Sequence, residues 1–348
     1  MQPNNSREGR ETRQYPLRMP PGWNPPVPAW VSVFDRNVRS VSMCVIGCQH
    51  QPDSDVSGFL RDLKTVGAGA DIADFATCTD RDGLHQSVGI LYWCDPIEAA
   101  RWLDCDAYEA FWEKHTSPAV GYGVFREMMN IPLERSETLF SGPEHNHGMS
   151  QARTSIEGPV DRHMYWGGMR DRIPYSANDA LDAGGPLRIV ESGENRVVVE
   201  AHENLCVIRS GQDWSHTTGV QREEYLEQIE PVLRAGMDFL RDKGEEVDCY
   251  TCRYMRQLDG AFAPDERSFG LAYFRTMKDL EDWAEHHPTH LAIFNRFLEI
   301  APKYGPGLQL RLWHEVSVLP AGNQLAEYVN CRPGTGLLAG VTMQMNTA

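Results

Sequence analysis

A histidine on an otherwise apolar helix face is the first side chain whose type and position could do chemistry. Pro288 suits the first turn of a helix, where its missing N–H costs nothing. His290, Phe294 and Phe297 then share one face at i, i+4 and i+7. A neutral imidazole on such a face can offer one nitrogen ligand to haem iron. It can equally be a hydrogen-bonded core histidine, and the neighbouring His287 is a rival ligand.

A second histidine lies in the strand expected at 308–318, where apolar and polar residues alternate. His314 is the polar exception on the strand face that otherwise carries leucine and valine. A buried titratable ring needs a hydrogen-bond partner or a task. Because histidine titrates near neutral pH, His314 could act as a general acid. A core histidine is the alternative.

Three further segments hold side chains that could bind a small polar ligand. Ser210 closes an expected strand, and its hydroxyl could bond a ligand or cap the following turn. Arg170 and Arg172 lie in a glycine-bearing loop that could bring them close to a ligand, or they could be surface arginines. Glu134 or Glu137 could orient a histidine, and an exposed acidic turn explains them equally well.

The elements that must position these residues form two similar halves. The first half is expected to hold strands at 40–47, 73–79, 86–93 and 123–130, with helices at 56–66 and 96–115. The second is expected to hold strands at 205–210, 246–255, 268–274 and 308–318, with helices at 221–243 and 277–301, the latter interrupted at Pro288. Each half therefore has the β-α-β-β-α-β order of a ferredoxin-like unit.

Short internal matches support a duplication, since Gly89–Tyr92 (GILY) aligns with Gly270–Tyr273 (GLAY) and Trp102 then aligns with Trp283. We predict an α+β fold in which two ferredoxin-like halves join into a barrel, which would remove exposed strand edges. The expected boundaries are a proline-rich N-terminal segment at 1–40, the halves at 41–140 and 204–320, a connector at 141–203, and a C-terminal tail at 321–348.

The amino-acid composition limits the kinds of partner that the protein is expected to bind. The 348 residues carry a formal net charge of −16, which disfavours nucleic acid and anionic membrane surfaces. No apolar run approaches the ~18 residues of a membrane span, and the N-terminal residues lack the apolar core of a signal peptide. Nine cysteines without a framework pattern are typical of reduced thiols. We expect a cytoplasmic protein with a small-molecule partner.

Four motifs together resemble those of the aldoxime dehydratases, haem lyases that form nitriles. They are GWNPPVPAW at 22–30, YWGGMRDR at 165–172, HPTH at 287–290 and RLWHEV at 311–316. The resemblance covers nearly the whole chain. It implies a dimeric α+β barrel that binds haem b, so we expect a homodimer.

The resemblance also implies a role for each candidate. His290 is similar to the family's proximal haem ligand, His314 to its distal catalytic histidine, and Ser210 to the distal hydroxyl that holds the oxime oxygen. The distal arginine falls at Arg170 or Arg172, of which Arg170 is preferred. The acidic partner of the histidine falls at Glu134 or Glu137, of which Glu137 fits the motif better.

The implied reaction is dehydration of an aldoxime, R–CH=N–OH, without net redox change. The oxime nitrogen coordinates ferrous iron, protonated His314 donates to the hydroxyl, and the same histidine then takes the C–H proton. The resemblance leaves the preference for aryl or alkyl aldoximes open. Three other interpretations are a peroxidase-like or chlorite-dismutase-like haem enzyme, a non-catalytic haem sensor, and a haem-free protein with core histidines.

Overall fold

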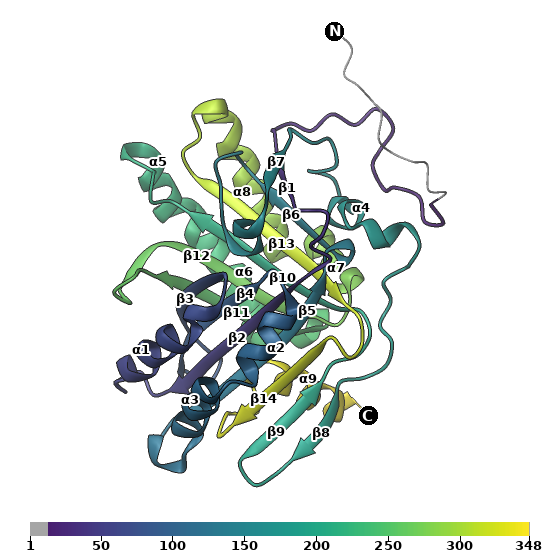
Figure 1. The fold of residues 1–348 in the computed structure, drawn as a ribbon. Helices are drawn as coiled ribbons and strands as arrows, with labels where there is room; N and C mark the ends of the chain where they lie inside the picture. The colour runs from purple at the N-terminus through teal and green to yellow at the C-terminus, as the bar shows by residue number, and fades with distance from the viewer. Residues whose placement is uncertain (1–12, 348) are drawn as a thin grey trace.

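The computed structural model describes residues 13–347, and its dominant element is a twelve-stranded antiparallel sheet (Figure 1). The strands follow the order β6-β13-β10-β12-β11-β3-β4-β2-β5-β14-β9-β8. A separate two-stranded sheet pairs β1 (Val31–Val33) with β7 (Ser155–Glu157). The first twelve residues of the predicted N-terminal segment lie outside the described residues.

The first half has four strands and three helices. The strands are β2 (Ser40–His50), β3 (Ile72–Thr79), β4 (His85–Trp93) and β5 (Gly123–Pro132), and the helices are α1 (Ser57–Val66), α2 (Pro96–Leu103) and α3 (Asp106–Thr116). Asp95 begins α2 by accepting a hydrogen bond from Ile97 N at 2.9 Å, with Pro96 in the first turn. In the sheet the strands run β5-β2-β4-β3.

The second half repeats this arrangement. Its strands are β10 (Leu205–Asp213), β11 (Cys249–Leu258), β12 (Pro264–Phe274) and β13 (Arg311–Leu319). Its helices are α5 (Gly219–Glu224), α6 (Glu230–Lys243), α7 (Met277–His286) and α8 (Pro288–Tyr304). The strands run β13-β10-β12-β11, so both halves place their fourth, first, third and second strands in that order, and β11 pairs with β3 to join them.

Segments outside the two halves extend the sheet at both ends. β6 (Ser136–Phe140) pairs with β13, while β14 (Gln324–Val329), β9 (Arg196–Glu200) and β8 (Arg188–Ser192) continue it beyond β5. The segments expected to be a connector and a tail therefore supply strands, and the chain ends in α9 (Leu337–Thr347). β6, β9 and β14 pair with strands distant in sequence, which a local pattern does not reveal, whereas β8 and β9 form a local hairpin.

The predicted order of strands and helices within the two halves is confirmed, but several bounds differ. The helix expected at 96–115 is divided into α2 and α3, and the strand expected from residue 246 begins at Cys249. The helix expected at 221–243 is divided by a π-helical turn at Tyr225–Ile229. Pro231 lies at the start of α6 and has no N–H to continue the regular ladder. The last strand begins at Arg311 rather than residue 308, because Gly305–Gly307 forms a 3-10 turn.

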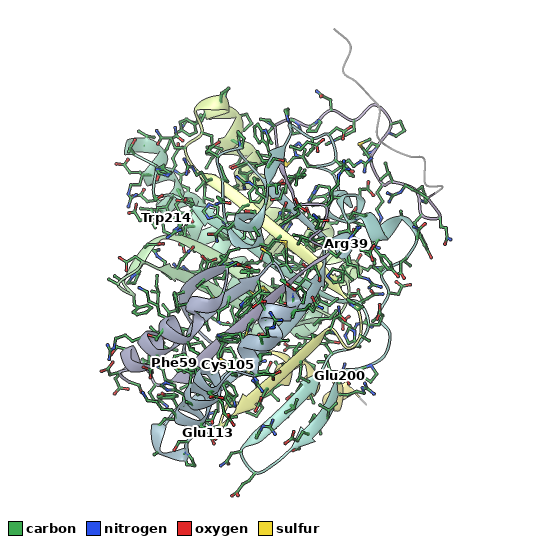
Figure 2. The ribbon with its side chains drawn as sticks, in the orientation of Figure 1. Arg39, Phe59, Cys105, Glu113, Glu200 and Trp214 are labelled. Atoms are coloured by element: carbon green, nitrogen blue, oxygen red, sulfur yellow. The ribbon has the colours of Figure 1, made fainter. Side chains whose placement is uncertain are left out.

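The sheet curls so that the inner faces of the two halves meet, and the helices cover the outer faces (Figure 1). One apolar cluster fills the interior between the halves, a second lies under the helices of the first half, and a third lies under α6 and α7 of the second. Phe59 belongs to the second cluster, and Trp214 lies just beyond β10 in a small fourth cluster (Figure 2). Among residues 13–347, no helix has the length and apolar character to cross a membrane.

A buried ion pair joins the two halves across this interior. Arg253 on β11 donates to both carboxylate oxygens of Glu127 on β5, at 2.7 and 2.6 Å. Tyr273 and Tyr328 donate to the same carboxylate at 2.6 and 2.8 Å. Because every lone pair of this buried carboxylate faces a donor, the pair satisfies the condition under which an interior charge is tolerated.

We predict that Arg253→Met lowers the free energy of unfolding by about 3–5 kcal/mol, because it leaves Glu127 as a buried carboxylate without its counter-charge. Arg101→Met is the matched control, since Arg101 pairs with Glu98 on the exposed surface of α2. That change should cost at most about 0.5 kcal/mol. Urea unfolding of both variants checks the difference, and equal losses would contradict the interpretation.

Candidate active site

Two neighbouring strands place Ser210 and His314 directly opposite each other. Ser210 on β10 pairs in register with His314 on β13, so the two side chains leave the same face of the sheet. That face carries Cys206, Val316 and Val318, which belong to the apolar cluster under α6 and α7. The alternation expected for the last strand therefore directs His314 toward the helices and not into the interior between the halves.

Glu137 is the hydrogen-bond partner of His314. Glu137 on β6 pairs in register with Val316, one diagonal step from His314 on the same face. Its Oε1 lies 2.9 Å from His314 Nε2. In the tautomer with the proton on Nε2, this contact is a hydrogen bond donated to Glu137, and Nδ1 is the ring nitrogen left for a ligand.

Arg172 completes the cluster from α4 (Gly168–Arg172). Its Nε donates to Glu137 Oε2 at 2.7 Å and its Nη2 to Oε1 at 3.0 Å, a bidentate charge-assisted contact. Nη2 also lies 3.0 Å from His314 Nε2. The Glu137 and Arg172 side chains are buried, whereas that of His314 is 21% exposed, so the histidine is the member of the cluster that a ligand can reach.

The electrostatics of the cluster favour an ionised Glu137. Burial alone would raise the pKa of this carboxyl, but the positive charges of Arg172 and His314 outweigh burial and lower its pKa to about 2. Glu137 is therefore an anion at every physiological pH. This fixed anion holds the His314 ring in one orientation.

His290 lies on α8, where one of its ring nitrogens donates a hydrogen bond and the other is left for a ligand. Nδ1 donates to Ala284 O at 2.7 Å, which leaves the Nε2 lone pair for a metal. Burial lowers the pKa of His290 even though this hydrogen bond acts in the opposite direction, so the ring is neutral near pH 7. Trp283 packs edge-on against it at a centroid distance of 4.7 Å.

The alternative ligand, His287, has a structural task. It is the N-cap of α8, where its Nδ1 lies 2.9 Å from Thr289 Oγ1 and accepts from Thr289 N at 3.4 Å. Its ring stacks on Phe239 at 4.0 Å. Nδ1 of His287 therefore has partners within α8, and the ring packs against α6.

Of the two arginines considered from the sequence, only Arg172 reaches His314. Arg170, the preferred candidate, contacts Glu281 on α7 instead, with Nε to Oε1 at 3.1 Å and Nη2 to Oε2 at 2.8 Å. Residues two apart on a helix point to opposite sides, so the five-residue α4 cannot present both arginines to one site. Glu134 lies exposed in a 3-10 turn, whereas Glu137 reaches the cluster.

Sequence reasoning missed Glu281, although a signal was present. The buried stripe of α7 consists of Met277, Leu280, Glu281 and Ala284, at helical spacing. A carboxylate inside an apolar stripe requires a buried counter-charge.

Comparisons with known proteins show the family to which the chain belongs. The sequence profile of the haem-containing dehydratases matches residues 44–337. The chain belongs to this family. An aliphatic aldoxime dehydratase from Rhodococcus globerulus is 37% identical over 92% of this chain and 93% of its own length. A phenylacetaldoxime dehydratase from Bacillus sp. (strain OxB-1) is 32% identical over the same shares. The predicted resemblance to aldoxime dehydratases is confirmed.

Solved structures agree in fold. A crystal structure of an aldoxime dehydratase in complex with butyraldoxime superposes with a TM-score of 0.88 at 36% identity, covering 94% of this chain and 93% of that one. A second aldoxime dehydratase structure also gives a TM-score of 0.88, at 34% identity, over 94% of this chain and 95% of that one. These likenesses confirm the mixed α and β architecture with its curled antiparallel sheet.

The residues of the site fit a haem group. Within residues 13–347, no cluster of three or more histidine, cysteine or carboxylate side chains could hold a bare metal ion. Haem needs only one protein nitrogen because the porphyrin supplies the other four equatorial ligands. His290 offers such a nitrogen, and the half-buried Phe294 and Phe297 follow it along α8.

We predict that Glu137→Gln makes folding stability less dependent on pH. The pKa of Glu137 is lower in the folded protein than its ordinary value of 4.5, so its stabilisation is complete above that value and is lost as pH falls toward 2. The stability advantage of the wild type over Glu137→Gln should shrink by about 1.4 kcal/mol per pH unit below pH 4.5.

Denaturant titrations from pH 7 to pH 3 measure this difference. Glu134→Gln is the control, because Glu134 is exposed three residues earlier, and its difference from the wild type should stay flat. A flat difference for Glu137→Gln as well would contradict the ion-paired state of the carboxylate.

Proposed function

We propose that this chain is a haem-dependent lyase that dehydrates aldoximes to nitriles. The observation that carries the proposal is the cluster of His314, Glu137 and Arg172 beside Ser210, with a neutral histidine, His290, on a separate helix. One set of residues suits proton transfer and the other suits iron ligation. The names of the relatives, aliphatic aldoxime and phenylacetaldoxime dehydratases, give the substrate class.

In this proposal His290 Nε2 would hold the iron of a haem b. When bound, the haem iron in its ferrous state supplies a coordination site for the oxime nitrogen and electron density that weakens the N–O bond. The Ala284 carbonyl keeps the His290 proton on Nδ1 and so keeps Nε2 directed away from it. The half-buried Phe294 and Phe297 of α8 would help to exclude water from a bound haem.

The proton transfers belong to His314. Glu137 accepts the Nε2–H of the protonated ring, and Nδ1–H protonates the oxime hydroxyl, which leaves as water. The neutral Nδ1 then takes the C–H proton, and R–CH=N–OH becomes R–C≡N and H2O. Ser210 donates to the oxime oxygen and fixes it beside His314. Arg172, in place of Arg170, supplies the distal positive charge through its contact with Glu137.

The finer description of the fold belongs to the same proposal. We assign each half to the ferredoxin-like class, and the shared order of fourth, first, third and second strand supports the assignment. Assembly as a homodimer in the cytoplasm follows from the resemblance to the family.

The direct test is conversion of an aldoxime by the haem-loaded, dithionite-reduced protein, with nitrile measured by gas chromatography. A spectrum of the reduced protein should change on addition of butyraldoxime or phenylacetaldoxime. A protein that retains haem but forms no nitrile from either would refute the proposal. Peroxide-dependent dye oxidation without nitrile would instead favour the peroxidase interpretation.

We predict that His290→Ala abolishes haem retention while the chain stays folded, because the variant has no axial nitrogen. Haem content by the pyridine haemochrome assay and secondary structure by circular dichroism measure the two properties. His287→Ala is the control: it loses the cap of α8 and about 1 kcal/mol of stability but keeps its haem. The reverse pattern would move the ligand to His287.

We predict that His314→Ala keeps haem and aldoxime binding but lowers kcat by about 10² or more, as expected for loss of a general acid. Ser210→Ala should weaken aldoxime binding as well as the rate, because a positioning hydrogen bond is lost. Nitrile formation is measured beside spectral titration of the reduced protein with aldoxime. Near-wild-type turnover of His314→Ala would show that another group is the acid, and loss of haem would exchange the roles of the two histidines.

A further inference from the structure

Helix α4 contacts two regions of the structure, the cluster around His314 and the helix α7 behind His290, and it uses one arginine for each. Arg172 contacts Glu137 and His314, whereas Arg170 contacts Glu281 on α7. α4 has only five residues, too few to hold its own position as an isolated helix. Its location therefore depends on what its side chains bind.

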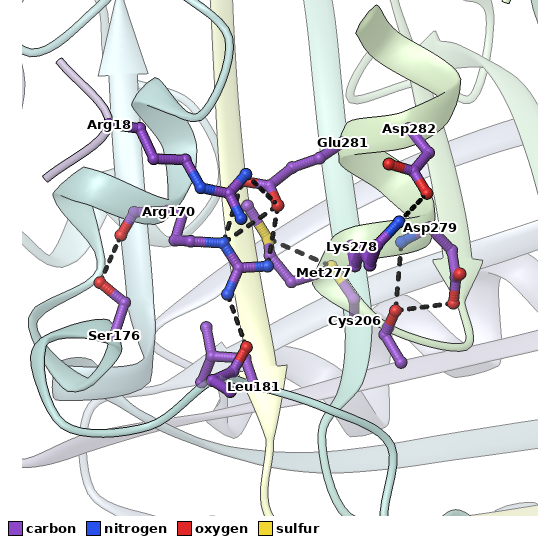
Figure 3. Close-up of polar contacts among 12 residues, drawn as sticks. Arg18, Arg170, Ser176, Leu181, Cys206, Met277, Lys278, Asp279, Glu281 and Asp282 are labelled. Carbon is purple, nitrogen blue, oxygen red and sulfur yellow. Dashed lines mark hydrogen bonds and ion pairs between the residues drawn. The ribbon is translucent and has the colours of Figure 1, made fainter. Parts of the chain in front are cut away.

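The contact between Arg170 and Glu281 is built as a rigid buried junction (Figure 3). Arg170 Nε and Nη2 both donate to the Glu281 carboxylate, at 2.8 to 3.1 Å, and Nη1 donates to Ala180 O at 2.6 Å. Arg18 Nη1 adds a donor to Glu281 Oε2 at 3.0 Å. The Glu281 side chain is 4% exposed, so little water competes for these bonds.

The N-terminal segment fastens the other side of α4. The Asp171 carboxylate accepts from Arg18 N and Met19 N at 2.9 to 3.1 Å, and from Tyr165 Oη at 2.8 Å. Gly167, with φ of +95°, lies so close to the Arg18 side chain that any Cβ there would meet it. The chain at Arg18 thus bridges α4 and α7.

Glu281 is also close along its helix to the group that orients His290. It precedes Ala284 by three residues, so the two lie on the same face of α7. Ala284 O is the acceptor that holds His290 Nδ1. The junction therefore connects the helix behind His290 to the helix that carries Arg172.

We propose that Arg170 and Glu281 are positioning residues that hold α4 against α7 and so fix Arg172, and through it Glu137 and His314, relative to His290. The inference rests on the proposed function, because the position of His314 relative to His290 matters only if both histidines serve the same reaction. Neither residue touches the reacting atoms. Arg170 acts through the placement of Arg172, so loss of the junction should move the distal charge without removing it.

The test compares two variants. Arg170→Lys keeps the charge but cannot make the bidentate contact. Arg170→Met combined with Glu281→Met removes both charges, so no unpaired carboxylate remains to unfold the chain. Both should retain haem. The C–O stretching band of the ferrous carbon monoxide complex, which senses nearby distal charge, should shift or broaden.

The kinetics should separate positioning from simple destabilisation. We expect kcat to fall by about 10- to 100-fold, as a misplaced catalytic group costs, with KM nearly unchanged. In an Arg172→Ala background the Arg170→Lys change should cost nothing further, because its effect passes through Arg172. If Arg170→Lys lowered kcat by the same factor in that background as in the wild type, the proposal would be wrong. An unchanged C–O band would also overturn it.

Arg126→Lys is the matched control. Arg126 Nε binds Glu327 at 2.8 Å in the first half, another arginine joined to a buried carboxylate. This change should lower the melting temperature but leave the C–O band in place. A band that shifts equally in the control would also overturn the proposal. A wild-type protein that binds haem and carbon monoxide but forms no nitrile would refute the proposed function alone, since the band comparison needs no turnover.

Discussion

The pairing of buried carboxylates with arginines is the constraint on which this structure depends. Glu127, Glu137, Glu281 and Glu327 are all nearly inaccessible to solvent, and each binds at least one guanidinium. A buried carboxylate without a partner would take up a proton or open the fold. These pairs join elements far apart in sequence, so they determine which strands and helices can approach one another.

The same constraint explains why adjacent positions of β13 differ in chemistry. His314 faces the helices and meets Glu137, whose pKa arginine lowers to about 2. Glu315 faces the interior between the halves, where burial raises its pKa and Tyr92 Oη and Met149 N donate to it. Its neighbour Arg209 directs Nη2 to Asp74 at 2.8 Å. On β13, burial therefore favours the protonated form of Glu315, whereas the adjacent His314 is held by the Glu137 anion.

Local sequence patterns were sufficient for the element order and for much of the candidate site. Alternation in β13 identified His314, and helical spacing after Pro288 identified His290. The pattern could single out these two residues because a polar residue on a regular apolar face is visible without knowing the fold. The terminal strand β14 was missed because its partner β5 lies nearly 200 residues earlier, and no local signal records that pairing.

The sequence could not choose between Arg170 and Arg172 for a related reason. Both arginines lie in one short motif, and only the positions of Glu137 and Glu281 distinguish them. Glu281 in the apolar stripe of α7 requires a positively charged partner, but the sequence alone does not identify which arginine that partner is. The discriminating information lies in long-range contacts, so it emerges only when both carboxylates are placed.

Pro288 shows how a local rule produces a functional orientation. In a continuous helix, Ala284 O would accept from the N–H of residue 288, four positions later. Proline has no N–H, so α7 ends at His286 and this carbonyl loses its regular partner. His290 Nδ1 supplies the missing donor at 2.7 Å. The break between α7 and α8 therefore creates the acceptor that fixes the imidazole, and the same hydrogen bond selects the ring nitrogen that the proposed function assigns to iron.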